Sequence, residues 1–151
     1  MFNDIAKRFS VILLTLVISA GYSYCQDHLD SLDIKVGGVE LVVEIAADRM
    51  AREQGLMHRE VLPEGMGMLF VFPDRREVRL WMKDTLIPLS AAFIDTDGRI
   101  MQIEHMEKTR STKVYRSNEM VKFSLEVPLG WFERNGIEAG DYCEIPDIPS
   151  N

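Results

Sequence analysis

Apolar and polar residues alternate most regularly between positions 120 and 128. In order, the alternating positions are Val121, Lys122, Phe123, Ser124, Leu125, Glu126 and Val127. Successive side chains of a β-strand point to opposite faces of its sheet. The pattern therefore predicts a strand with one buried apolar face and one polar face, carrying Glu126, that meets solvent.

The densest run of apolar and aromatic residues outside the N-terminus covers residues 65–98. Strand-forming residues gather there in three short pieces, 68–72, 78–82 and 91–95, and turn-forming residues separate the pieces. This composition is typical of strands and their boundaries. We predict three neighbouring strands in the middle of one sheet, with a solvated turn of mixed charge at residues 74–77.

Two turns that contain glycine predict hairpins. A Gly-Gly pair at 37–38 divides the strand-like residues 34–45, and an Asp-Gly pair at 97–98 divides residues 91–104. Glycine adopts the positive φ angles that tight hairpin turns require. We therefore expect an antiparallel pair of strands on both sides of each turn.

Two short helices are predicted, at residues 48–54 and 129–135, because helix formers there lie between capping and turn residues. Asp48 has the side chain that suits the N-terminal cap of the first helix. Polar residues at 107–112 predict a mobile loop, and residues 142–145 predict a last strand.

The first 25 residues have the pattern of an export signal. Lys7 and Arg8 precede an apolar run at residues 9–20, which is far shorter than the ~20 residues that a membrane-spanning helix needs. We predict a signal peptide at residues 1–25 that is removed during export to the periplasm or beyond. The alternatives are an uncleaved segment that anchors the protein to the inner membrane, or a lipid attached at Cys25.

The remaining length suits one domain with a single core. We assign residues 26–32 to a flexible lead-in, residues 33–146 to one β-rich domain and residues 147–151 to a tail. If export removes Cys25, Cys143 has no disulfide partner in the chain. A buried position as a small apolar residue is then the expected role of Cys143.

The chain has a net charge of -7, and its lysines and arginines form no cluster along the sequence. Binding to nucleic acid depends on a basic surface that meets phosphates. We therefore expect no nucleic-acid partner, and contact with a membrane only through the N-terminal segment if that segment is retained. The oligomeric state is left open.

The ordered motifs of the chain resemble a known family. They are Gly55-Leu56-Met57, Leu62-Pro63, Gly67-Met68-Leu69-Phe70, Trp81-Met82-Lys83, Thr85, Ile87-Pro88-Leu89, Phe93-Ile94-Asp95, Asp97-Gly98, Leu125-Glu126, Gly130-Trp131-Phe132, Gly136-Ile137 and Gly140-Asp141. In this order they resemble the uncharacterised bacterial and archaeal proteins grouped as domain of unknown function 192. The resemblance covers residues 42–142.

The resemblance implies a compact, mostly β (α+β) fold, which is barrel-like or a strongly bent antiparallel sheet with one or two short helices. It implies no activity, so no catalytic residue is carried over. The sequence departs from the family at Ser90, where the family usually has Asp, and at Asp84, where it often has Asn. If that family Asp were catalytic, Ser90 could not replace it.

The best candidate for a functional site centres on Trp81. On a strand, Trp81, Lys83 and Thr85 share one face, so an apolar ring would lie beside a cation and a hydroxyl. The candidate ligand-binding residues are Trp81, Lys83, Thr85, Arg59, Asp95 and Glu126. Our main hypothesis is an exported binding or accessory module whose pocket holds a small polar or anionic molecule.

Three alternatives stay open. In a purely structural domain, Trp81 would be fully buried with no cavity beside it. In an envelope hydrolase, Asp95 and Glu126 would converge in one cleft, and one of them would have a raised pKa.

A Cu(I)-handling protein would use thioether and imidazole ligands. The residues of these types are Met57, His58, Met66, Met68, Met101, His105 and Met106. Their spacing forms no array on one element, and packing explains most of the methionines better. We therefore assign no metal and no cofactor.

Overall fold

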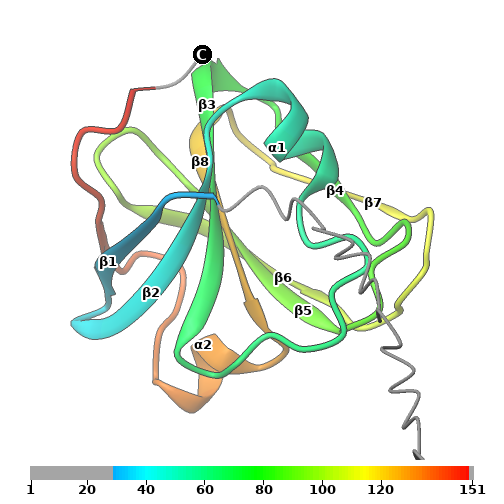
Figure 1. Cartoon of the computed structure of the whole chain (residues 1–151). Coiled ribbons are helices and arrows are strands. Elements are labelled where there is room, and N and C mark those ends of the chain that lie inside the picture. The colour runs from blue at the N-terminus through cyan, green and yellow to red at the C-terminus, as the bar shows by residue number, and fades with distance from the viewer. Residues whose placement is uncertain (1–28, 150–151) are drawn as a thin grey trace, which may run out of the picture.

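The computed structural model of the chain describes residues 29–149, within which nine strands and two short helices follow one another (Figure 1). The elements are β1 (Ser31–Val36), β2 (Val39–Ala46), α1 (Arg49–Gln54), β3 (Met66–Arg76), β4 (Arg79–Trp81), β5 (Leu89–Ile94), β6 (Ile100–Met106), β7 (Val114–Arg116), β8 (Val121–Pro128), α2 (Trp131–Arg134) and β9 (Cys143–Glu144). The mostly β fold class is thereby confirmed. The predicted signal peptide and Cys25 lie outside the described residues.

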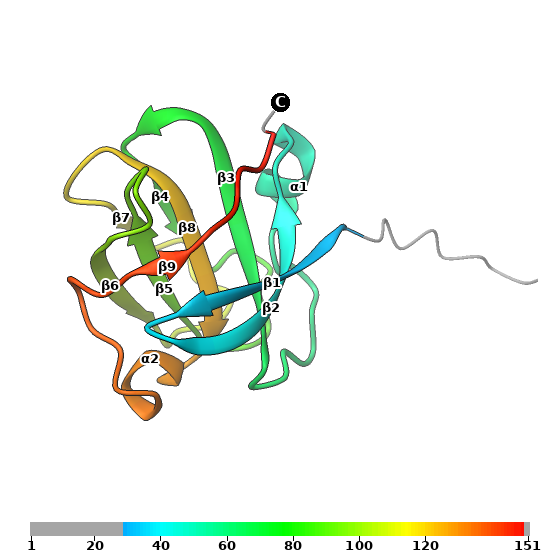
Figure 2. The same ribbon diagram turned by 90° about the vertical axis from the view of Figure 1, so that its left-hand side faces the viewer.

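Seven strands form one strongly curled sheet in the order β6-β5-β8-β3-β2-β1-β9. At one edge of the sheet, β9 pairs with β1 (Figure 2). Backbone contacts between the chain before β9 and the start of β6 draw the two edges of the sheet together. The Cys143 amide donates to the Gly98 carbonyl at 2.8 Å. Gly98 has a φ of +85°, and a Cβ there would collide with the Cys143 carbonyl, so this closure requires glycine.

One pair in the curled sheet is parallel, which differs from the predicted antiparallel sheet. β2 pairs with β3 in parallel register, and α1 forms part of the connection between them. Asp48 caps α1 as predicted, because its Oδ1 accepts a hydrogen bond from the Ala51 amide at 2.9 Å. A parallel pair needs such a crossover, and a short helix supplies it.

The prediction of three neighbouring strands within residues 65–98 is wrong. β8 lies between β3 and β5, and β4 leaves the curled sheet to pair with β7 in a separate two-stranded ribbon. Residues 73–76 continue β3 instead of forming a turn. Closeness along the chain therefore did not set the pairing here, since β8, from the later part of the chain, pairs with both β3 and β5.

Both predicted hairpins are confirmed: β1 pairs with β2, and β5 pairs with β6, antiparallel. β1 begins at Ser31, inside the segment predicted as a lead-in. The polar loop at 107–112 is present, but the short strand β7 that follows it was not predicted. Between residues 29 and 149, no helix is long and apolar enough to cross a membrane.

The curled sheet is apolar on both faces. Its inner face forms one core cluster with α2, to which β8 contributes Phe123, Leu125 and Val127. Cys143 belongs to this inner cluster and is 3% exposed, so its predicted buried position is confirmed. Burial raises the pKa of its thiol to about 12, with a smaller effect from Asp141.

Candidate functional site

The outer face of the sheet carries a second core cluster, and α1 and the β4–β7 ribbon cover it. The cluster includes Met68 and Phe70 of β3, Phe93 of β5 and Tyr115 of β7. Cover from these elements is the reason that the polar face predicted for β8 does not meet solvent. Ser124 is fully buried, and Glu126 is 5% exposed.

A cavity of about 770 Å³ opens between α1, the second half of β3 and the chain that follows β4. Basic, acidic, neutral polar, aromatic and apolar side chains line it. The lining residues are Arg49, Arg52, Glu53, Gln54, Gly55, Leu56, Met57, Phe70, Phe72, Arg76, Arg79, Leu80, Trp81, Lys83, Thr85 and Glu126. Gly55 ends α1 with a φ of +48°, and a Cβ there would press on the Phe70 ring, so glycine lets the helix end seat closely beside the cavity.

Four of the six candidate residues line this one cavity: Trp81, Lys83, Thr85 and Glu126. The other two, Arg59 and Asp95, lie elsewhere. Trp81 is 46% exposed, so the expectation for a purely structural domain, a fully buried indole without a cavity, is wrong.

The Lys83 ammonium lies over the Trp81 ring, with Nζ 5.3 Å from the ring centroid. This contact does not come from strand alternation, since β4 ends at Trp81 and Lys83 lies in a tight turn. Asp84 continues that turn with a φ of 53°, and its carbonyl accepts a hydrogen bond from the His58 amide at 2.9 Å. Asn and Asp both tolerate this left-handed conformation, which explains why either residue suits the position.

Thr85 ends the same turn and is 4% exposed. Its amide donates to the Met82 carbonyl at 3.2 Å, and its hydroxyl is 3.3 Å from the Lys83 carbonyl. The second contact is long for a hydroxyl hydrogen bond. The Thr85 hydroxyl is therefore held loosely and can turn toward a molecule in the cavity.

Glu126 lies in the middle of β8, opposite Met68 of β3 and Ala91 of β5. Burial raises the pKa of its carboxyl to about 8. No hydrogen bond or ion pair joins Glu126 to another described residue. No side-chain oxygen of residues 29–149 is both sealed from solvent and unpartnered, so the Glu126 oxygens open on the cavity. At neutral pH this carboxyl is mostly protonated.

Two guanidinium groups lie near the ring of Phe72. The Cζ atoms of Arg52 and Arg76 are 5.7 and 5.8 Å from the ring centroid. Arg52 also donates to the Ala47 carbonyl and, at 2.9 Å, to the Val71 carbonyl. Burial lowers the pKa of Arg52, and the nearby charge of Arg76 lowers it further. The effect of Arg76 on this pKa shows that the two like charges lie near each other, and Asp48 acts in the opposite direction.

The cavity lining has five basic side chains against two acidic ones, although the chain has a net charge of -7. Among the described residues, three of these basic groups have carboxylate partners: Arg49 pairs with Glu53 and Arg79 with Glu77, each at 2.7 Å, and Arg76 lies 4.0 Å from Asp74. The basic residues come from α1, β3, β4 and the turn after β4, so they form no cluster along the sequence. The site is therefore a local positive region on an acidic protein.

Arg59 does not line the cavity, although the sequence analysis named it as a candidate ligand-binding residue. Its Nη1 donates to Glu44 Oε1 at 2.8 Å, and its Nη2 contacts Glu44 Oε2. This two-pronged ion pair joins the loop after α1 to β2. The role of Arg59 in the structure is to fasten that loop.

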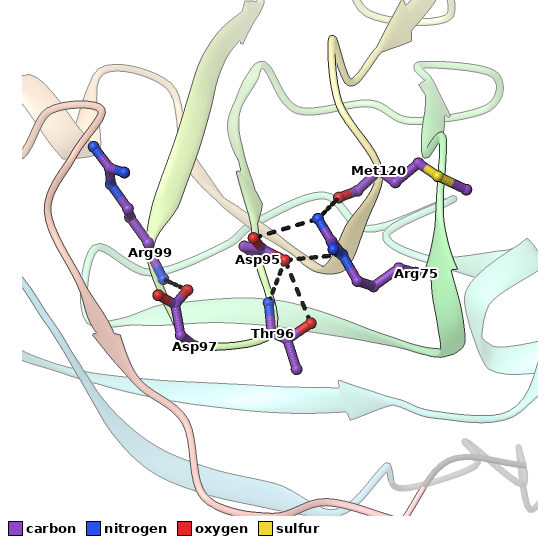
Figure 3. Close-up of polar contacts among 6 residues, drawn as sticks. All are labelled: Arg75, Asp95, Thr96, Asp97, Arg99 and Met120. Carbon is purple, nitrogen blue, oxygen red and sulfur yellow. Dashed lines mark hydrogen bonds and ion pairs between the residues drawn. The ribbon is translucent and has the colours of Figure 1, made fainter.

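Asp95 follows the last residue of β5 and forms an ion pair with Arg75, in which Nε and Oδ1 are 3.1 Å apart (Figure 3). It also accepts from the Thr96 amide at 2.7 Å. Glu126 pairs with Ala91, four residues earlier on β5, a separation of about 13 Å along a strand. The predicted convergence of Asp95 and Glu126 in one cleft is therefore wrong, although the predicted raised pKa is present at Glu126.

Ser90 lies on the inner face of the sheet, away from the cavity. Its Oγ accepts a hydrogen bond from the Gly130 amide at 2.9 Å, at the start of α2. An Asp at this position could accept the same hydrogen bond. The departure from the family pattern at Ser90 thus removes no group from the cavity.

Core packing accounts for several of the methionines considered for copper. Met68 and Met106 are fully buried in the outer core cluster, and Met101 packs against it. His105 Nε2 is 2.7 Å from Glu133 Oε1 of α2. Within the described part of the chain, no group of three or more His, Cys, Asp or Glu side chains could hold a metal ion.

The sequence analysis missed Arg52, Phe72 and Arg76 as cavity residues. Arg76 was assigned to a solvated turn, but β3 continues through it. The pairing of β3 with β8 is irregular between Val71 and Arg76, so simple strand alternation does not place Arg76 on the face of Phe70 and Phe72. No pattern in the sequence therefore indicated that these residues share a cavity.

Comparisons with known proteins support the fold. A crystal structure from Sinorhizobium meliloti 1021, of a protein described as a proposed transcription regulator, is 36% identical, with a TM-score of 0.74; the match covers 77% of this chain and 94% of that one. A protein of unknown function from Novosphingobium aromaticivorans DSM 12444 is 27% identical, with a TM-score of 0.75, over 81% of this chain and 90% of that one.

No curated protein matches the sequence. The family model of DUF192, described as "Uncharacterized ACR", matches residues 32–145. This match spans most of the chain, and it agrees with the family that the ordered motifs resemble. The chain therefore belongs to the DUF192 family of uncharacterized proteins.

Proposed function

We propose that this protein is an exported binding module that holds a small anionic molecule in the cavity beside α1. The observation that carries the proposal is Glu126, a buried carboxyl that lines the cavity and has no partner among residues 29–149. A buried polar group without a partner destabilises a fold by ~1–3 kcal/mol. A ligand that completes this group explains why the position holds Glu instead of an apolar residue.

The charge of the lining supports an anion over a neutral or cationic ligand. Five basic side chains surround the cavity, and Arg52 and Arg76 bring two guanidinium groups close to one ring. Guanidinium groups suit carboxylate and phosphate oxygens because they offer several N–H donors in one plane. The bound molecule therefore carries an oxyanion.

The walls of the cavity support a ligand that also has a flat or apolar part. Trp81 is half exposed at the rim, while Leu56 and Phe70 contribute apolar surface within. A pocket with apolar walls and a few polar groups is the usual form of a small-molecule site. Trp81 would cover the flat part of the ligand.

Export is the second part of the proposal, and the N-terminal pattern supports it. Lys7, Arg8 and the apolar run at 9–20 are typical of a signal peptide. Expression with the native N-terminus, followed by fractionation and mass spectrometry of the mature end, tests this part. A cytoplasmic protein that retains Met1 would overturn it, and an intact N-terminus in the membrane fraction would show the anchored alternative.

The description of the Sinorhizobium protein as a proposed transcription regulator introduces nucleic acid as a rival ligand. The net charge of -7 disfavours contact with a phosphate backbone. A small-molecule site fits the cavity better, because the basic groups line a concave surface instead of a broad face. Duplex DNA therefore belongs in the binding test as a competitor.

The test is a fluorescence titration of the purified full chain with benzoate, with benzyl alcohol as the neutral analogue. The chain has two tryptophans, and of these Trp81 lines the cavity whereas Trp131 is 3% exposed in the inner core. We expect benzoate, but not benzyl alcohol, to change the fluorescence. Trp81→Phe should remove that change.

Matched lysines make the test specific. Lys113 lies over the Tyr115 ring at 4.3 Å, just as Lys83 lies over Trp81, but Lys113 does not line the cavity. Lys83→Ala and Arg76→Ala should each weaken benzoate binding about tenfold, because a charged hydrogen bond contributes ~1.5–3 kcal/mol. Lys113→Ala should bind as the wild type does. Equal binding by all variants, or binding of duplex DNA without benzoate, would refute the proposal.

A further inference from the structure

We infer that Glu126 makes anion binding depend on a proton: its carboxyl donates a hydrogen bond to a carboxylate of the ligand, and loss of that proton expels the ligand. This inference rests on the proposed function, since it concerns the same cavity. It adds the ligand class, a molecule with a carboxylate on a flat apolar part, and the means of release.

The geometry around Glu126 supports a neutral donor. Its cross-strand neighbours, Met68 on β3 and Ala91 on β5, have no charge and no hydrogen-bonding group in their side chains. Neither of these two side chains can therefore stabilise an ionised carboxyl at this position. Glu126 lines the cavity, and no sealed, unpartnered side-chain oxygen occurs among residues 29–149, so its oxygens are reached from the cavity.

The covering elements do contribute charged groups to the cavity. On α1 they are Arg49, Arg52 and Glu53, and on β3, β4 and the following turn they are Arg76, Arg79 and Lys83. None of these makes a hydrogen bond or ion pair with Glu126. Burial alone is the cause of the raised Glu126 pKa, so the basic groups lie too far away to hold the carboxyl in its charged form.

A carboxylate ligand fits between Glu126 on one side of the cavity and the basic groups on the other. One of its oxygens can accept a hydrogen bond from the protonated Glu126 carboxyl, and the other can meet the basic groups. A hydrogen bond from a neutral carboxyl to a carboxylate is short and strong. When Glu126 is ionised, two carboxylates face each other in a buried place, and their repulsion opposes binding.

The pH dependence of benzoate binding tests the inference. Benzoate stays ionised from pH 6 to pH 9, and Lys and Arg stay protonated, so Glu126 is the cavity group that titrates. Burial places its pKa at about 8. If only the protonated form binds, the apparent affinity of the wild type falls about tenfold between pH 7 and pH 9.

Two substitutions of similar size serve as controls. Glu126→Gln keeps a hydrogen-bond donor that cannot ionise, so its benzoate affinity should be the same at pH 7 and pH 9. Glu126→Leu has no donor, so its binding should be weak at both pH values. Circular dichroism verifies that each variant is folded, and if Glu126→Leu does not fold, the comparison of Glu126→Gln with the wild type decides alone.

Calorimetry gives an independent readout of the same step. At pH 9, titration in buffers of different ionisation enthalpy should show that the wild type takes up close to one proton on binding benzoate, and Glu126→Gln none. Equal pH profiles for the wild type and Glu126→Gln would overturn the inference. If the pH profiles are equal but Lys83→Ala and Arg76→Ala still weaken benzoate binding, the proposed function stands and only the inference about the proton fails. If benzoate binds at no pH, both the proposed function and the inference are overturned.

Discussion

The two faces of the curled sheet differ in how completely they are filled. The inner face packs against α2, where Trp131 and Phe132 meet edge to face with ring centroids 5.4 Å apart. The outer face is just as apolar over most of its area, but its covering elements leave a cavity that exposes one buried carboxyl, Glu126. A face that is packed throughout serves stability, whereas a face with an unfilled polar position has room for a ligand.

The two acidic candidates from the sequence, Asp95 and Glu126, likewise differ in how completely their polar groups are satisfied. Asp95 is tied to Arg75 and to the Thr96 amide, as Figure 3 shows. Glu126 has no such partner among the described residues and remains mostly neutral. The satisfied carboxylate fixes a turn, and the unsatisfied carboxyl is the one that can respond to a ligand.

The largest expected effect is on the packed face. Phe132 is fully buried, so Phe132→Ala should lower the free energy of unfolding by ~3–5 kcal/mol, through lost burial and a residual void. Benzoate binding by the folded fraction should not change. Met50, 79% exposed, provides the control, since Met50→Ala should leave stability unchanged. A loss below ~1 kcal/mol for Phe132→Ala in urea unfolding would show that the inner face is not the better packed one.

The next effect concerns Glu126 and depends on pH. Its pKa rises from an ordinary 4.5 to about 8 in the folded protein, so between these values the folded state holds a proton that the unfolded state has lost. The free energy of unfolding of the wild type should therefore fall as pH rises through this window, by up to ~1.4 kcal/mol per pH unit. Below pH 4.5 the titration of Glu126 does not change the free energy of unfolding, and above pH 8 the loss of stability stays constant.

Glu126→Gln removes this dependence, because the amide does not titrate. The stability of the variant relative to the wild type should increase between pH 5 and pH 8, and reach a few kcal/mol at pH 9. Urea unfolding at pH 5, 7 and 9 measures the difference. A difference that stays constant with pH would mean that Glu126 titrates normally, and that the outer face is as well satisfied as the inner one.

The smallest effect concerns Ser90 on the inner face. Ser90→Ala leaves the partly buried Gly130 amide without its acceptor, so the free energy of unfolding should fall by ~1–3 kcal/mol. Ser111 accepts a similar bond from the exposed Lys113 amide, and Ser111→Ala should change stability by less than ~0.5 kcal/mol. Weaker benzoate binding in Ser90→Ala would contradict the separation of the two faces.

The resemblance to the family implied the mostly β class, and local patterns predicted the hairpins and the Asp48 cap. They did so because a Gly-containing turn and a capping side chain act within a few residues of themselves. The same patterns failed at β3 and β4, where the pairing partner lies far along the chain. β8 separates β3 from β5, and β7, a strand that the sequence analysis missed, pairs with β4.

For the site, the sequence alone determined which residues combine an apolar wall with polar groups, and it named Trp81, Lys83, Thr85 and Glu126. Only the tertiary structure decided that these four share a cavity and that Arg59 and Asp95 do not. Glu126 shows the reason: alternation fixes which face of β8 it occupies, but α1 and the β4–β7 ribbon determine whether that face meets water. Burial by distant elements, and with it the pKa of a carboxyl, is a property of the assembled fold.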